Sequence, residues 1–157
     1  MKKSIVSLGM LIGAILSGCS EPEAAINASS MFSVSDYEYT MNDKQAVSIS
    51  FGETQNNFCS ATIYRASVAA GYEVSSQQKS SKDISVDCNW SGKYYVQSSK
   101  HQTSVKFEML SIDPKTKTAE ATVSVKLVEP SSGKYFKLGV TPLVISGEHF
   151  DHLTKKM

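Results

Sequence analysis

A period-two alternation of apolar and polar residues constrains the fold of this chain more than any other feature of its sequence. Between residues 104 and 128, apolar residues recur at alternate positions on both sides of the turn 113–117, which contains Pro114. Because successive side chains of a β-strand point to opposite faces, each half of this segment would have one apolar and one polar face. The sequence therefore predicts an antiparallel β-hairpin with one buried face.

The same alternation recurs in three other segments. Apolar residues share one expected strand face at Val47, Ile49 and Phe51, at Ile84, Val86, Cys88 and Trp90, and at Phe136, Leu138 and Val140. Pro142 has no backbone N–H to donate, so we expect a sheet edge or a bend there. Together these segments predict a mainly β fold, an antiparallel sandwich or barrel with Cys88 and Trp90 pointing into its core.

Residues 57–71 depart from this pattern. Alanines are dense there, Asn57 is a good helix N-cap and Gly71 a good C-cap, so we expect one helix of about three turns. Residues 58–64 also alternate, and the β-branched Thr62 and Ile63 leave a strand open as the alternative.

The amino-terminal residues have the layout of a secretory signal. Lys2 and Lys3 precede an apolar run over 5–16 that is too short to be a convincing membrane-spanning helix, and Leu16-Ser17-Gly18-Cys19 follows. This tetrapeptide resembles the lipobox of bacterial lipoproteins. The resemblance implies that residues 1–18 are a signal peptide, that Cys19 is acylated, and that the chain is cut between Gly18 and Cys19. The alternative is an ordinary secretory signal with an incidental cysteine.

The same resemblance implies a location in the cell. In lipoprotein sorting as the family is generally described, Ser20 after the lipidated cysteine permits transport to the outer membrane. Acyl chains on Cys19 would hold the protein there, and we expect it to face the periplasm. Residues 19–30 are small and polar and would form a flexible tether, so 31–157 remain as a single β-rich domain.

The charge of the chain argues against nucleic acid as a partner. Its formal net charge is +1, and removal of residues 1–18 would take away Lys2 and Lys3 and leave it near −1. Arg65 is the only arginine, whereas the recognition of phosphates and bases relies heavily on arginine.

The remaining two cysteines are expected to pair. If Cys19 carries lipid, Cys59 and Cys88 are left as an even pair in an oxidising compartment, which favours a disulfide. The competing interpretation is a catalytic or metal-binding thiol. It has no Cys-x-x-Cys spacing and no histidine nearby in the sequence to support it.

Catalytic and metal-binding motifs give little support for an enzyme. The only cluster of metal-ligand types is Glu148-His149-Phe150-Asp151-His152, for which we expect a solvated C-terminal turn and no metal site. The chain has no nucleophile elbow and no nucleotide-binding glycine loop. We therefore expect no catalytic residues, no cofactor and a function other than catalysis.

Aromatic residues beside a turn give the best lead for a binding surface. Large rings near exposed turns favour contacts with a protein partner. The candidate residues for such contacts are Trp90, Ser91, Tyr94, Tyr95 and Tyr135. The alternative is that Trp90 and Tyr94 belong to the core and Tyr95 is an ordinary surface residue.

Ser91-Gly92-Lys93-Tyr94-Tyr95 is similar to the Ser-Gly-x-x-Tyr phrase of the membrane-bound C-type lysozyme inhibitors, small periplasmic lipoproteins with a β-barrel and a disulfide. The similarity implies that Ser91 and Tyr95 would enter the cleft of a lysozyme. The match covers five residues, and the family's Tyr-x-x-x-Thr-Lys-Gly motif is missing.

These observations predict a membrane-anchored envelope lipoprotein whose domain is a non-enzymatic binding or accessory module for a protein or an envelope component. A periplasmic lysozyme inhibitor is the first alternative, and a metal-binding or hydrolytic domain is the second.

Overall fold

The computed structural model describes residues 31–35, 40–77 and 83–156. The predicted signal peptide 1–18, the lipidated Cys19 and the tether up to residue 30 lie outside the described residues. Within these described ranges, ten strands form one antiparallel sheet that is not closed.

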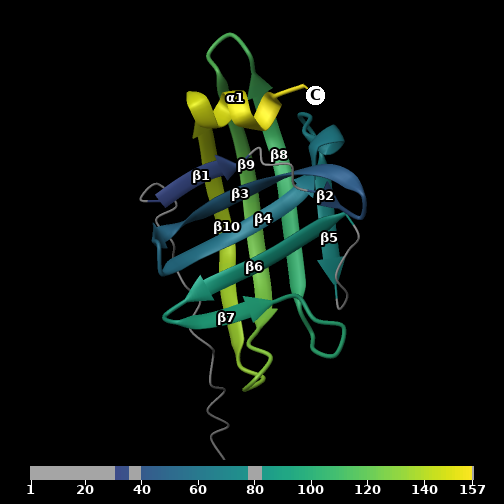
Figure 1. Ribbon diagram of the computed structural model, residues 1–157, viewed down its shortest axis with the longest axis vertical. Coiled ribbons are helices and arrows are strands. Elements are labelled where there is room, and N and C mark those ends of the chain that lie inside the picture. The colour runs from purple at the N-terminus through teal and green to yellow at the C-terminus, as the bar shows by residue number, and fades with distance from the viewer. Residues whose placement is uncertain (1–30, 36–39, 78–82, 157) are drawn as a thin grey trace, which may run out of the picture.

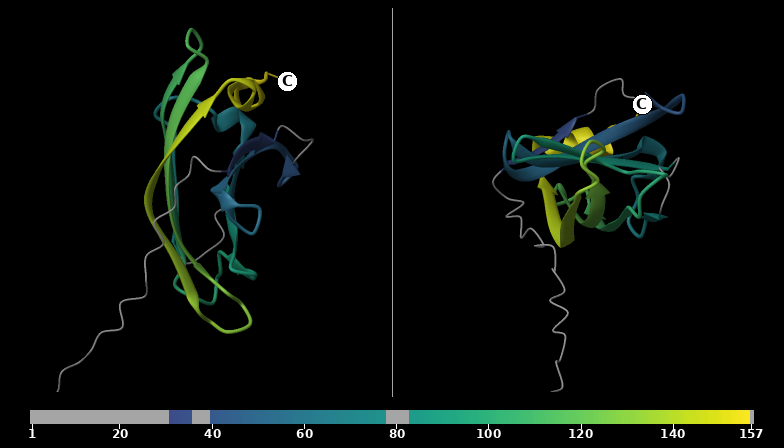
Figure 2. Two further views of the ribbon diagram at one scale, coloured as in Figure 1. Left: turned by 90° about the vertical axis from the view of Figure 1, so that its left-hand side faces the viewer. Right: turned by 90° about the horizontal axis from the view of Figure 1, so that it is seen from below.

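The sheet folds into two layers, which Figures 1 and 2 show from three sides. The first layer has the strand order β1-β3-β4-β6-β7, with β2 also paired to β3. The bounds of these strands are Met31–Ser35 (β1), Thr40–Met41 (β2), Lys44–Thr54 (β3), Asn57–Tyr64 (β4), Ile84–Trp90 (β6) and Lys93–Val96 (β7).

The second layer has the order β10-β9-β8-β5. Their bounds are Glu73–Gln77 (β5), Ser104–Asp113 (β8), Thr118–Val128 (β9) and Tyr135–Ser146 (β10). A single pair, Val96 with Val128, connects β7 to β9 and so joins the two layers. The strands of one layer run across those of the other at a steep angle (Figure 1), as in orthogonal sheet packing.

The core lies between the layers and follows the alternation of the sequence. The expected hairpin is confirmed as β8 and β9, with Asp113 opposite Thr118 at its turn. Its inward side chains include Phe107, Met109 and Val123, all buried. The inward residues of β3 and β6 are buried against them, and Trp90 packs on the same core while half-buried. The predicted β-rich antiparallel fold is therefore confirmed.

The helix expected over 57–71 is wrong. Residues 57–64 form β4, with β3 on one side and β6 on the other, and only Arg65–Ser67 makes a short 3-10 turn, η1. Cys59, Ala61 and Ile63 alternate into the core, so pairing with two neighbours outweighs the helical tendency of the alanines. Asn57 caps no helix; its side chain accepts a hydrogen bond from the backbone N–H of Ser91 at 2.8 Å.

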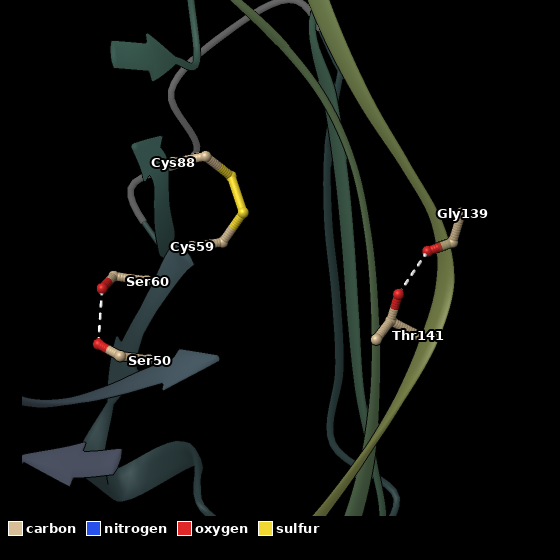
Figure 3. Close-up of a disulfide and its surroundings, with 6 residues drawn as sticks. All are labelled: Ser50, Cys59, Ser60, Cys88, Gly139 and Thr141. Atoms are coloured by element: carbon tan, nitrogen blue, oxygen red, sulfur yellow. Dashed lines mark hydrogen bonds between the residues drawn. A yellow bond between two sulfur atoms is a disulfide. The ribbon is translucent and has the colours of Figure 1, made fainter. Parts of the chain in front are cut away.

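The apolar face expected over 136–140 ends at Leu138 and does not include Val140. Phe136 and Leu138 are buried, but Val140 is 75% exposed because the register of β10 against β9 shifts between Leu138 and Thr141. A one-residue shift moves every following side chain to the other face. The Thr141 hydroxyl donates to the carbonyl oxygen of Gly139 at 3.1 Å inside this bulge (Figure 3). Within the described residues β10 pairs only with β9, and exposed Pro142 lies on this edge strand, as expected.

The C-terminal segment is a helix where we expected a solvated turn. Helix α1, Glu148–Thr154, lies across one end of the two layers and contacts β1 and β10 (Figures 1 and 2). Phe150 and Leu153 are spaced three residues apart, so both fall on the same helical face, and both are buried. The helix therefore belongs to the core.

Candidate functional site

The disulfide predicted between Cys59 and Cys88 is confirmed. The two cysteines lie directly opposite each other on β4 and β6, and both are fully buried. Figure 3 shows the disulfide on the side of the first layer that faces the second, whereas the hydrogen-bonded hydroxyls of Ser50 and Ser60 lie on the outer side. The disulfide thus fixes the strand that leads into the candidate aromatic turn.

That turn connects β6 to β7 through Ser91 and Gly92. Both residues have positive φ, 51° and 72°, which is the backbone of a tight hairpin turn whose twist suits antiparallel strands. The hydrogen bond from the Ser91 N–H to the Asn57 side chain ties the turn to the start of β4. The turn is exposed and held by its neighbours.

Two of the candidate aromatic residues face the interior. The rings of Trp90 and Tyr95 lie 5.2 Å and 5.3 Å from the ring of Phe136, centroid to centroid. Both side chains are half-buried and pack against the core. Most of the surface that these two rings could offer to a partner is therefore occupied by contacts within the protein.

Tyr94 faces outward and is 55% exposed. It lies opposite Asn89 on β6, and its hydroxyl forms a hydrogen bond with the carboxyl group of Asp87. Burial raises the pKa of Asp87 above its usual value, and the hydrogen bond with Tyr94 lowers it in part. A flat ring beside two polar side chains is suited to contacts with a partner.

Tyr135 lies on the other layer. It alternates with the buried Phe136, so its ring faces outward from β10, and the ammonium group of Lys126 lies 4.3 Å from the ring centroid. The ring of His101 approaches its edge at 6.4 Å. The structure therefore places Tyr94 and Tyr135 on opposite outer faces and does not bring the five candidate residues into one surface.

The histidines of the C-terminal cluster contribute to local structure. The Nδ1 atom of His149 accepts a hydrogen bond from the backbone N–H of Val34 at 3.4 Å, which connects α1 to β1. The part of the chain that the structure describes contains no group of three or more potential metal-ligating side chains.

An open cleft beside α1 is the feature that the sequence did not predict. Its volume is about 960 Å³, within the usual range for small-molecule sites. We call it the α1 cleft. It lies between α1, the start of β3, η1 and the end of β8, at the end of the molecule opposite the β6–β7 turn (Figure 1). Its apolar lining residues are Ala66, Val68, Ile112, Pro114, Phe150 and Leu153.

Basic side chains also line the α1 cleft. They come from three separate segments and are Lys44, Arg65, Lys155 and Lys156. None of the lining residues that the structure describes is acidic. The cleft therefore combines an apolar surface with a positive charge, and this combination arises only when β3, η1 and α1 come together.

Arg65 holds one wall of the cleft in place. Its Nη1 atom donates to the backbone carbonyl oxygens of His152, Leu153 and Lys155 at 2.9, 3.4 and 3.2 Å. These carbonyls belong to the last turn of α1 and to the residue that caps it, Lys155, and the carbonyls at the end of a helix have no backbone donor within the helix to satisfy them. The Nη2 atom of the same guanidinium is buried and has no hydrogen-bond partner among the described residues.

Two sequence signals could have marked this site. Arg65 is the only arginine of the chain, and Lys155-Lys156 directly follow a segment whose apolar residues are spaced three apart. Their proximity in space could not be read from the sequence, because 87 residues separate Arg65 from His152.

No protein-family model, curated protein or solved structure matches this chain. The helices among the described residues are too short or too polar to cross a membrane.

Proposed function

We propose that this protein is a lipid-anchored lipoprotein of the bacterial outer membrane, and that its β domain is a non-enzymatic binding module facing the periplasm. The anchor is supported by the signal-like residues 1–18 and by Cys19 at the lipobox position. Two or more acyl chains on one residue would give stable attachment without a membrane-binding surface on the domain.

The anchor is tested by metabolic labelling with palmitate. The full chain should incorporate the label and fractionate with outer membranes, and Cys19→Ala should abolish both. Cys19→Ala that still carries palmitate would show that Cys19 is not the acylated residue.

The α1 cleft is the observation that carries the proposed binding function. It is an open concave site with an apolar lining and converging polar groups, and such sites are the usual places where proteins hold small molecules. Of the two classes of partner that the sequence favours, a cleft of this kind suits an envelope component better than a folded protein.

Filling the cleft tests whether it holds a ligand. Ala66 is exposed and lines the cleft, whereas Ala70 is exposed, lies four residues away and does not line it. Protein isolated from cell envelopes should yield a co-purifying small molecule in organic extracts analysed by mass spectrometry. Ala66→Trp should lose it and Ala70→Trp should keep it. Identical extracts from both variants would contradict binding in the cleft.

A second candidate function is contact with a protein through Tyr94. The ring is more than half exposed, and it lies on a turn that the disulfide and Asn57 support. A photo-crosslinking amino acid at position 94 should capture a defined partner in cells, whereas the same residue at exposed Ser99 should not. Equal capture from both positions would remove this candidate.

The lysozyme-inhibitor alternative is less well supported. The similarity implies that Tyr95 enters a lysozyme cleft, but the Tyr95 ring packs on Phe136 inside the domain. Undiminished lysis by lysozyme in excess purified protein would eliminate this alternative. For the metal-binding or hydrolytic alternative, elemental analysis that finds bound metal would favour it.

A further inference from the structure

The floor of the α1 cleft is continuous with the protein core. Phe150 and Leu153 reach it from α1, Val68 from the segment after η1, and Ile112 from the end of β8. Val68 and Ile112 are half-buried and pack against the core cluster. Phe150 and Leu153 are themselves buried, so the open apolar surface comes from Val68, Ile112 and the exposed Ala66 and Pro114. A hydrocarbon placed along this floor would cover that surface, which favours binding of an alkyl chain.

The basic residues lie where an anionic head group would be needed. Lys44 and Lys156 are exposed, and the Lys44 ammonium lies 5.4 Å from the centroid of the Tyr64 ring, which also lines the cleft. With no acidic residue among the described lining residues, these cations would attract a negative charge. Arg65, which also lines the cleft, adds its guanidinium group to this positive charge.

We propose that the α1 cleft binds a long-chain fatty acid, with the acyl chain along the apolar floor and the carboxylate beside the basic residues. This inference rests on the proposed binding function and names its ligand class. A single alkyl chain with one anionic head group satisfies both halves of the cleft, whereas an uncharged lipid satisfies only the floor and a small anion only the basic residues.

The experiment uses the full chain in nanodiscs of phosphatidylcholine, which carries no net charge. One probe is palmitic acid with a photoactivatable diazirine in its chain, and the matched probe is palmityl alcohol with the same diazirine. Mass spectrometry of peptides then gives the share of labelling that falls on cleft residues. We expect this share to be about tenfold higher for the acid, which corresponds to about 1.4 kcal/mol.

Two pairs of variants locate the binding. Ala66→Trp should remove most of the labelling by the acid, and Ala70→Trp should leave it unchanged. The double variant Lys44→Glu and Lys156→Glu should lower it about tenfold, because two cations next to the carboxylate become anions. The control, Lys100→Glu with Lys134→Glu, makes the same change of net charge at exposed positions that do not line the cleft.

The outcomes separate the ligand class from the proposed function. Equal labelling of the cleft by acid and alcohol would overturn the fatty-acid inference and leave cleft binding intact. If Ala66→Trp leaves the amount of labelling by the acid unchanged, the probe binds outside the cleft and the inference is wrong. If lysophosphatidylglycerol displaces the probe and unlabelled palmitate does not, the head group is a phosphate and the inference is wrong. Labelling by neither probe, together with an empty extract, would contradict both proposals.

Discussion

The guanidinium group of Arg65 donates a hydrogen bond to the backbone carbonyl oxygen of His152 at 2.9 Å. This contact joins the 3-10 turn after β4 to the end of α1, and it forms one wall of the α1 cleft. The arginine therefore performs the role of a helix C-cap from a distant part of the chain.

Replacing Arg65 should loosen α1. Arg65→Met keeps the length of the side chain but leaves the carbonyl oxygens at the helix end without their donor, so we expect a loss of about 1–3 kcal/mol of stability. Hydrogen exchange should show faster exchange of the α1 amides, and urea unfolding should give the loss of stability. Arg65→Lys keeps a cation, so its stability should lie between those of the wild type and Arg65→Met. Unchanged exchange in Arg65→Met would show that the helix does not depend on this contact.

Removing the disulfide should destabilise the whole domain. Cys59→Ala with Cys88→Ala releases a closed loop of 29 residues in sequence separation, for which the chain-entropy model gives about 3–4 kcal/mol. Urea unfolding of the double variant and of the reduced wild type should give similar losses. A loss in the variant that greatly exceeds the loss on reduction would point to packing of the buried cysteines as the main contribution.

The stability of the protein should depend on the ionisation of Asp87. Burial raises the pKa of Asp87 above the ordinary value of 3.8, so the folded protein holds this proton more tightly than the unfolded chain. The contribution of Asp87 to stability is therefore most favourable below pH 3.8 and is lost as pH rises through the folded pKa.

Asp87→Asn tests this dependence and keeps an acceptor for the Tyr94 hydroxyl. The melting temperature of Asp87→Asn relative to the wild type should rise as pH increases above 3.8 and level off once Asp87 is ionised in the folded state. The exposed Glu120→Gln serves as a control for the change in net charge. A difference between Asp87→Asn and wild type that does not vary with pH would contradict the role of burial.

Tyr94 and Tyr95 should respond in opposite ways to truncation. Tyr94 is largely exposed, so Tyr94→Ala should change the free energy of unfolding by at most about 1 kcal/mol. Tyr95 packs on Phe136, so Tyr95→Ala should cost about 2–3 kcal/mol, less than for a fully buried ring. Thermal melts of both variants provide the measurement, and equal losses would mean that Tyr94 also has a packing role.

Local alternation in the sequence was enough to predict most strands. Phe107 and Val123 lie opposite each other on two strands joined by a short turn, and both face the core. Their inward direction could be predicted because side chains alternate along a strand whatever its neighbouring strands are. The disulfide followed from the number of cysteines, and Cys59 and Cys88 are cross-strand neighbours.

Segments governed by pairing could not be predicted in the same way. The alanine-rich residues 57–64 become a strand because β3 and β6 supply backbone partners on both sides. Val140 turns outward because a bulge shifts the register after Leu138. Neither effect leaves a local mark in the sequence, since each depends on a neighbouring strand.

The sequence by itself determined the β class of this protein, the pairing of its two domain cysteines and the side of each regular strand that faces inward. Only the tertiary structure decided that Lys44, Arg65 and Lys156 line one cleft with the apolar residues of α1. The physical reason is the distance along the chain over which each effect acts. Alternation is a property of adjacent residues, whereas the cleft depends on contacts such as those of Arg65 with residues 87 to 90 positions away.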